Sequence, residues 1–115
     1  MLKTKSIYAQ IEPDDGLRLL VMRYWPRGVK KDRVSMWLKD LGPTPELIKS
    51  WKTGRLTWDE FKDRYRLEFN GAARRDAFNS LKAAIKTSGN VTLICSCADE
   101  DRCHRGLLKE LLEEE

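Results

Sequence analysis

The stretch LRLLVMRYW, residues Leu17–Trp25, is almost continuously apolar and rich in residues that favour strands. A run of this kind is typical of a strand that is buried on both faces of a parallel sheet. The turn sequence PDDG precedes it at Pro13–Gly16, and Pro26 ends it because proline cannot donate to a strand ladder. The segment VTLICSC, Val91–Cys97, has the same character and follows the turn Ser88–Asn90. We therefore predict two central strands, at residues 17–25 and 91–97.

Helical signals fill the segment between these two strands. The four helices that we expect here begin at Asp32, at Thr44-Pro45, at the capping box Thr57–Glu60 and at Ala72. In the first of them, Val34, Trp37, Leu38 and Leu41 fall at helical spacing, and Gly42-Pro43 is the stop signal. The spacing also predicts that Trp37, Trp51 and Trp58 pack in the core.

Two further elements complete the predicted fold. Ile7–Ala9 is a short apolar patch that predicts another strand, and HRGLLKELLEEE, which begins at His104, predicts a final helix. Strands joined by a helical crossover are parallel neighbours in most folds. We therefore expect one α/β domain over residues 1–115. Its core would be a small, mainly parallel sheet of three or four strands, flanked by helices, with a multi-helix crossover before the last strand.

Composition restricts the classes of protein to consider. The apolar runs are far shorter than the roughly 20 residues of a membrane span. The first twelve residues, MLKTKSIYAQIE, lack the apolar core and cleavage site of a signal peptide. We therefore expect a cytoplasmic protein without a membrane partner. Three cysteines, an odd number, also argue against a disulfide framework in such a reducing compartment.

The positive charge is unevenly distributed along the chain. The formal net charge is +4, and Arg18, Arg23, Arg27, Lys30, Lys31 and Arg33 lie within sixteen residues that contain one acidic residue, Asp32. Such a segment, with Tyr24 and Trp25 as stacking surfaces, is compatible with binding to a nucleic acid or a nucleotide. No recognised nucleic-acid motif accompanies it, so this interpretation ranks second.

The segment CSCADEDRCHR, Cys95–Arg105, contains every cysteine and the single histidine of the chain. Cys95, Cys97, Cys103 and His104 are the residue types that bind zinc. Their spacing fits poorly, because the C-x2-C knuckle is absent and adjacent residues at a helix start point in different directions. We therefore predict no metal and no cofactor.

A reactive thiolate is the second interpretation of this segment. Cys103 falls in the expected first turn of the last helix, where the helix dipole and the positive charge of Arg102, His104 and Arg105 would stabilise a thiolate. The acidic residues at positions 99–101 oppose this effect. Cys97, at the end of the strand that faces this helix start, could benefit in the same way. The C-x5-R signature of phosphatase loops is not matched, because Cys103 stands where the arginine would be needed.

The third interpretation is an anion site without covalent chemistry. Parallel strands have their carboxyl ends at the same edge of the sheet, so RYWPRG and CSCADEDRCHR should meet there. A helix start with His104 and Arg105, opposite Arg23 and Arg27, would bind a phosphate or a carboxylate.

Purely structural roles compete with these interpretations. A cysteine near the end of a buried strand often serves as a small apolar side chain, and we assign that role to Cys95. A histidine in the first turn of a helix is often only a hydrogen-bonding residue. Trp25 leaves a strand just before a proline, which favours a place on a pocket wall.

These segments together resemble the domain-of-unknown-function 488 family, in its short YeaO-like form. The resemblance covers nearly the whole chain and rests on LLVMRYWPRGVKKD, WLKDLGPTPELIKSW, WDEFKDRYRLEF and VTLICSCADEDRCHR. Met22 departs from the pattern, in which Asp often stands directly before the arginine. The resemblance implies an α/β fold and supplies no reaction.

Two functional hypotheses follow. The first is a small enzyme for a phosphate- or carboxylate-bearing substrate. Its catalytic residues would be Cys97, Cys103 and His104, and its substrate-binding residues would be Arg23, Tyr24, Trp25, Arg27 and Arg105. The second is a binding module for nucleic acid or a nucleotide, without catalysis.

Overall fold

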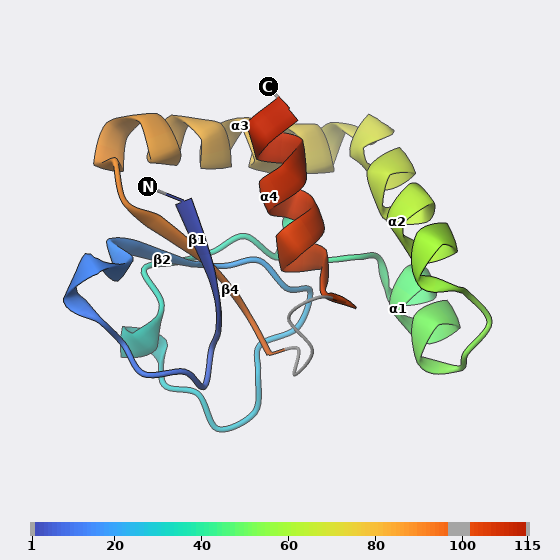
Figure 1. The fold of residues 1–115 in the computed structure, drawn as a ribbon, viewed down its shortest axis with the longest axis horizontal. Coiled ribbons are helices and arrows are strands. Elements are labelled where there is room, and N and C mark those ends of the chain that lie inside the picture. Colours follow the sequence, from blue (N-terminus) through green and yellow to red (C-terminus); the bar gives the residue numbers. More distant parts are fainter. Residues whose placement is uncertain (1, 97–101, 115) are drawn as a thin grey trace.

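A four-stranded, all-parallel sheet forms the centre of the protein, with the strand order β1-β4-β2-β3. Figure 1 labels β1, β4 and β2. The computed structural model describes residues 2–96 and 102–114. Its strands are β1 (Leu2–Ser6), β2 (Leu17–Leu20), β3 (Met36–Trp37) and β4 (Val91–Cys95), and its α-helices are α1 (Pro45–Lys52), α2 (Trp58–Leu67), α3 (Ala72–Ser88) and α4 (His104–Glu114). Within these ranges, no helix has the length and apolar character needed to cross a membrane. The α/β class, the parallel sheet and the helix-rich segment before the last strand are confirmed.

Strands β2 and β4 are parallel neighbours, as the sequence predicts. Leu17 pairs with Val91 and Leu20 pairs with Ile94, and the N–H of Val21 still donates to the carbonyl of Ile94 at 2.9 Å. Strand β2 is shorter than the predicted 17–25, because the chain then turns away from β4. The predicted strand at 91–97 ends at Cys95, and its last residue, Cys97, lies outside the described residues.

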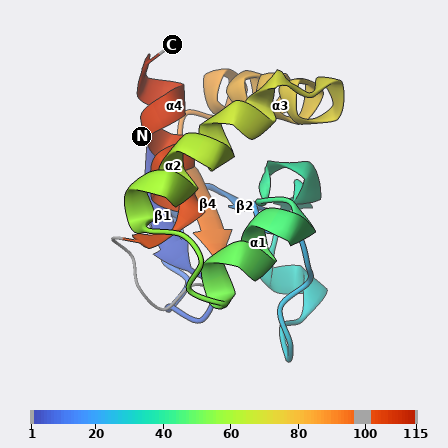
Figure 2. The same ribbon diagram turned by 90° about the vertical axis from the view of Figure 1, so that its right-hand side faces the viewer.

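The two faces of the sheet are covered differently. Leu19, Val91 and Leu93 belong to the large core, which the helices complete with residues such as Tyr65 and Leu108. On the opposite face, a smaller cluster of Ile7, Leu20 and Ile94 is covered by Met22, Trp25, Val29 and Val34, which lie in the loop after β2. The α-helices therefore contribute to the core on one face, and a loop closes the other (Figure 2).

The predicted helix that begins at Asp32 is wrong. Residues 31–41 form two 3₁₀ turns, Lys31–Arg33 and Lys39–Leu41, with the edge strand β3 between them. The N–H of Ser35 donates to the carbonyl of Arg18, and the N–H of Leu38 donates to that of Leu20, both at 2.8 Å. Pairing with β2 satisfies backbone groups along that strand, and this tertiary gain outweighs the local helical spacing.

Trp37 is consequently not a core residue. It lies on β3 with 39% of its surface exposed, and its ring packs edge-on against Trp25 at a centroid distance of 5.4 Å. Trp51 and Trp58 do pack against the large core as predicted, and both contact Phe61.

Strand β1 lies earlier in the chain than the predicted strand at Ile7–Ala9. It comprises Leu2–Ser6 and pairs with β4 from Leu2↔Val91 to Ser6↔Cys95. Ile7 follows the strand and is fully buried. The lysines at positions 3 and 5 hide this strand in the sequence, because charged residues are unexpected in a half-buried strand. Their ion pairs with Asp15 make these positions acceptable for lysine.

The other predicted helices are confirmed, and their caps explain where they begin. The hydroxyl of Thr44 accepts a hydrogen bond from the N–H of Leu47 at the start of α1. Thr57 and Glu60 form the reciprocal capping box of α2, with distances of 3.0 and 3.2 Å. These caps fix the entry points of the two helices that later line the candidate site.

Asp15 is a buried carboxylate that holds three cations beside the sheet. Lys5 contacts it at 2.7 Å, Lys3 at 3.2 Å and Arg18 at 2.5 Å, and the N–H of Glu12 also donates to it. Burial alone would raise the pKa of Asp15, but the hydrogen bonds from Lys5, the Glu12 backbone, Lys3 and Arg18 hold it well below its ordinary value. The charged form therefore stabilises the fold at neutral pH.

We predict that Asp15→Asn lowers the free energy of unfolding by about 3 kcal/mol, because it leaves the buried Arg18 without its negative partner. The matched control is Asp14→Asn, which removes one exposed ion pair with Lys3 and should cost less than about 1 kcal/mol. Urea unfolding at pH 7 measures both. Because the depressed pKa makes the contribution of Asp15 disappear only in acid, the difference between wild type and Asp15→Asn should persist above pH 5 and shrink as the pH falls below about 4. Equal stabilities of the two variants at pH 7 would contradict this role.

Candidate functional site

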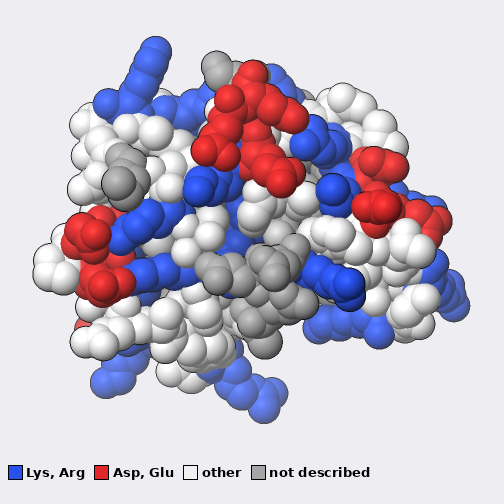
Figure 3. Space-filling model, viewed as in Figure 1, with Lys and Arg blue, Asp and Glu red and all other residues white. Residues whose placement is uncertain are grey.

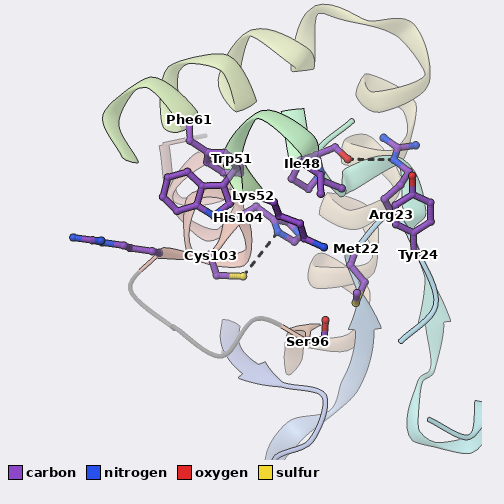
Figure 4. A pocket seen from close by; sticks show the side chains of 12 residues that line it. Met22, Arg23, Tyr24, Ile48, Trp51, Lys52, Phe61, Ser96, Cys103 and His104 are labelled. Atoms are coloured by element: carbon purple, nitrogen blue, oxygen red, sulfur yellow. Dashed lines mark hydrogen bonds between the residues drawn. The ribbon is translucent and has the colours of Figure 1, made fainter. Parts of the chain in front are cut away.

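A pocket of about 170 Å³ opens at the carboxyl edge of the sheet, where β2 and β4 end (Figure 4). Its walls come from the chain after each strand, from the start of α4, and from α1 and α2. The lining residues are Met22, Arg23, Tyr24, Pro43, Ile48, Trp51, Lys52, Phe61, Ser96, Arg102, Cys103 and His104. The expected meeting of the two strand ends is therefore present, and helices α1 and α2 supply an apolar wall to it.

His104 is the most constrained polar residue of the pocket. It is buried at the start of α4, and its Nε2 lies 2.5 Å from the carbonyl oxygen of Val21. A carbonyl can only accept, so Nε2 carries the proton and Nδ1 has the lone pair. Nδ1 faces Cys103, with the sulfur 3.9 Å away. Burial lowers the pKa of His104, so the imidazole is neutral at physiological pH.

The two described cysteines lie against each other behind this histidine. The sulfur of Cys103 is 2.8 Å from that of Cys95, and both residues are buried. Arg105 places Nη1 3.2 Å from the sulfur of Cys95 and 3.4 Å from its carbonyl oxygen. The predicted core position of Cys95 is confirmed, since none of its surface is exposed. Cys97 lies outside the described residues.

These two cysteines and His104 carry atoms of the types that bind zinc. The ligand atoms of Cys95, Cys103 and His104 all lie within 4.8 Å of one another. Zinc holds its sulfur ligands at about 2.3 Å in a tetrahedron, which separates two sulfurs by roughly 3.8 Å. The two thiols would therefore have to move apart by about 1 Å to accept an ion in this geometry.

Arg23 lines the pocket, but its guanidinium is used to hold the neighbouring loop. It donates to the carbonyl oxygens of Pro43 at 3.3 Å and Gly42 at 3.1 Å, and it pairs with Asp40 at 3.2 Å. Gly42 lies so close to the exit of β2 that a Cβ there would come within 2.3 Å of the N atom of Arg23. Arg23 and Gly42 thus fix the pocket wall formed by the loop before α1.

The other residues predicted to bind substrate are distributed over different places. Tyr24 lies at the pocket rim with 56% of its surface exposed. Trp25 donates from its indole to the carbonyl of Val29 and lines a separate hollow beside β3. Arg27 is exposed and is not among the pocket residues, and Arg105 is buried beside Cys95. The structure therefore does not bring Arg23, Arg27 and Arg105 together.

Half of the basic segment on which the nucleic-acid hypothesis rests is engaged inside the protein. Arg18 pairs with Asp15, Arg23 holds the loop described above, and Arg33 donates to the carbonyls of Ile7 and Ala9. Its exposed members are Arg27, Lys30 and Lys31. Clusters of both signs also share the face drawn in Figure 3. These placements give the hypothesis no specific support.

Several pocket residues were not found from the sequence. Their spacing assigns Trp51 and Phe61 to helix packing, and no sequence pattern singles out Ile48, Lys52 or Ser96 as a site residue. For Trp51 and Lys52 the available signal is their position in the last turn of α1, a helix that lines the pocket.

Comparison with known proteins now gives the family. The family described as "Active DUF488-N3 subclade" matches residues 2–115. The chain is 35% identical over 115 residues to the uncharacterized proteins Mb3100c of Mycobacterium bovis and Rv3073c of Mycobacterium tuberculosis, with coverage of 96% of this chain and 92% of each relative. It is 29% identical over 113 residues to the uncharacterized protein YeaO of Escherichia coli, with coverage of 96% of both chains.

The chain belongs to this DUF488 family. The resemblance inferred from the WPRG and CHR segments is thereby confirmed. No solved structure matches the chain. The names of these relatives assign no reaction.

We predict that Gly42→Ala lowers the free energy of unfolding by about 2–3 kcal/mol, because its Cβ would collide with the backbone at Met22–Arg23. Gly71→Ala is the matched control: its φ of −77° is close to the −73° of Gly42, and the nearest atom to its Cβ is 3.6 Å away. It should cost less than about 1 kcal/mol. Thermal and urea unfolding compare the two. If Gly42→Ala is as stable as the wild type, the loop at Gly42 does not pack tightly against the backbone that follows β2.

We also predict that the stability of the wild type falls as the pH drops from 7.5 to 5.5. The buried imidazole of His104 has its pKa lowered from the ordinary value of 6.5, so the unfolded chain binds a proton that the folded chain does not. The free energy of unfolding should decrease below pH 6.5 by up to about 1.4 kcal/mol per pH unit. His104→Gln keeps an amide N–H that can reach the carbonyl of Val21 and does not titrate, so its profile should be flatter. A flat wild-type profile would show that the imidazole is not held neutral.

Proposed function

We propose that this protein is a small enzyme that acts on a phosphate- or carboxylate-bearing substrate in the pocket at the carboxyl edge of the sheet. The observation that carries the proposal is the position of Cys103 and His104 on the wall of that pocket, with the imidazole lone pair directed at the thiol. A thiol next to a correctly oriented base is the basic arrangement of nucleophilic catalysis.

Cys103 is the proposed nucleophile. It immediately precedes α4, and its carbonyl accepts from the N–H of Gly106, so the sulfur lies at the positive end of an eleven-residue helix. The thiol proton passes to Nδ1 of His104, and the sulfur attacks the electrophilic centre of the substrate. The lowered pKa of the imidazole means that it readily returns this proton to the leaving group. Water then hydrolyses the covalent intermediate.

The pocket surface favours a substrate with one apolar and one anionic part. Ile48, Trp51 and Phe61 line it with apolar and aromatic surface, and Lys52 and Arg102 are exposed cations among its lining residues. An apolar cavity with a few polar groups that fix orientation is typical of small-molecule sites. The anionic group would lie at the cationic rim, and the reacting centre would lie near Cys103.

The remaining predicted residues receive distinct roles in this proposal. Arg23 positions the loop that carries Pro43, and Tyr24 contacts the substrate at the rim. Direct contacts from Trp25, Arg27 and Arg105 stay predictions, as does a catalytic role for Cys97. We expect the protein to work in the cytoplasm, where its thiols remain reduced.

Alkylation of the reduced protein by iodoacetamide tests the nucleophile. We predict that at pH 7 Cys103 reacts at least about tenfold faster than a small model thiol, which is mostly protonated at that pH. Peptide mapping identifies the modified residue. If every cysteine reacts at the ordinary rate, or if none reacts while the protein is folded, the thiolate mechanism is wrong.

Protection by an anion tests the substrate class in the same assay. Millimolar inorganic phosphate, or acetate as a carboxylate, should slow the alkylation of Cys103. Lys52→Gln should lose much of this protection, whereas Lys49→Gln should keep it, because Lys49 is exposed on the same helix and does not line the pocket. Protection that is absent, or equal in the two variants, would remove the anion part of the proposal and leave the nucleophile intact.

A further inference from the structure

The sulfurs of Cys95 and Cys103 lie closer together than is needed for packing in the core or for a role of Cys103 as a lone nucleophile. The two sulfurs are 2.8 Å apart, although the residues lie eight positions apart in the chain, one at the end of β4 and one just before α4. A disulfide bond is about 2.05 Å long, so less than 1 Å of movement separates this contact from a covalent bond. The fold therefore holds the two sulfurs within about 1 Å of disulfide bonding distance.

The groups around the pair favour a thiolate on one of the two sulfurs at a time, because two thiolates 2.8 Å apart would repel each other. Nη1 of Arg105 donates toward the sulfur of Cys95 at 3.2 Å. Cys103 has the N-terminus of α4 beside it, and the unprotonated Nδ1 of His104 lies 3.9 Å from its sulfur. Positive groups and helix N-termini are the surroundings in which cysteines become reactive toward oxidants.

The two cysteines differ in their access to the pocket, and the size of the pocket limits which oxidants can reach them. Cys103 lines the pocket, whereas Cys95 is not a lining residue and has none of its surface exposed. Only 2% of the surface of Cys103 is exposed, and the pocket has a volume of about 170 Å³. A protein disulfide cannot enter such a space, but a small hydroperoxide can.

We infer that Cys103 and Cys95 form a redox site that reduces a small hydroperoxide, with Cys103 as the attacking thiolate and Cys95 as the resolving thiol. This activity shares Cys103 with the proposed function and needs no anionic ligand. Cys103 attacks a peroxide oxygen, the O–O bond breaks, and the alcohol leaves with a proton, so that Cys103 becomes a sulfenic acid. Cys95 then attacks that sulfur, and water leaves. In sum, one hydroperoxide and two thiols give one alcohol, one water and one disulfide, and the two electrons come from the thiols. An external dithiol restores the pair.

The test uses the full chain, first reduced and then freed of reductant. One equivalent of hydrogen peroxide at pH 7 should lower the intact mass by two hydrogen atoms. Peptide mapping without reduction should recover Cys95 linked to Cys103. The reaction should be at least about tenfold faster than that of a small model thiol, because the thiolate is the reacting species. Dithiothreitol should restore the original mass.

Three variants divide the steps. Cys95→Ser should stop at a sulfenic acid on Cys103 that dimedone traps, Cys103→Ser should lose the fast reaction, and Cys97→Ser should still form the Cys95–Cys103 bond. Circular dichroism checks that each variant is folded. If a variant does not fold, peptide mapping of the oxidised wild type still tests whether Cys95 and Cys103 become linked. Thiols that stay reduced, a linkage that requires Cys97, or a bound metal ion that resists dialysis and blocks both thiols would overturn the inference. Protection of Cys103 by phosphate is measured on the reduced protein and tests the proposed function, whereas formation of the disulfide is measured without phosphate and tests the redox site. Each proposal can therefore fail without the other.

Discussion

The parallel pairing of β2 with β4 is the constraint on which the rest of the structure depends. Neighbouring strands that run in the same direction cannot be joined by a tight turn, so the chain must return over the sheet before β4 begins. Helices α1, α2 and α3 lie in that connection, and their apolar faces form the large core. The same pairing places both strand exits at one edge, which brings Met22–Tyr24 and Ser96 to the walls of one pocket.

Backbone carbonyl oxygens at the edge of the pocket accept hydrogen bonds from side chains that are distant in the sequence. The carbonyl of Val21 accepts from His104, and that of Gly42 accepts from both Arg23 and Arg74. Arg74 is buried, its guanidinium lies over the rings of Tyr65 and Phe69, and it also pairs with Glu68. Backbone groups that leave the sheet ladder thus find charged or aromatic partners, and these partners orient the residues proposed for chemistry.

Local chemistry in the sequence predicts much of this fold, and non-local pairing decides the rest. The apolar runs of β2 and β4 and the caps at Thr44 and Thr57 are local signals, and each gives the correct element. The segment 31–41 has a helical pattern as well, but its backbone pairs with β2. A pairing between distant segments cannot be predicted from local sequence patterns. The roles of the arginines are hidden for the same reason. The partners of Arg23 are Asp40, Gly42 and Pro43, and only the folded chain shows that this guanidinium is already engaged.

The strand order also governs how the chain reaches its native state. Strand β4 follows the other three strands in the chain, yet it lies between β1 and β2. During synthesis, β1 and β2 are therefore made long before the strand that pairs with both of them. The four-stranded sheet can be completed only after residues 91–95 have left the ribosome, and until then the edge of β2 that β4 will cover lacks its partner. Since Cys95 ends this strand, the dithiol is assembled in the same late step that completes the sheet.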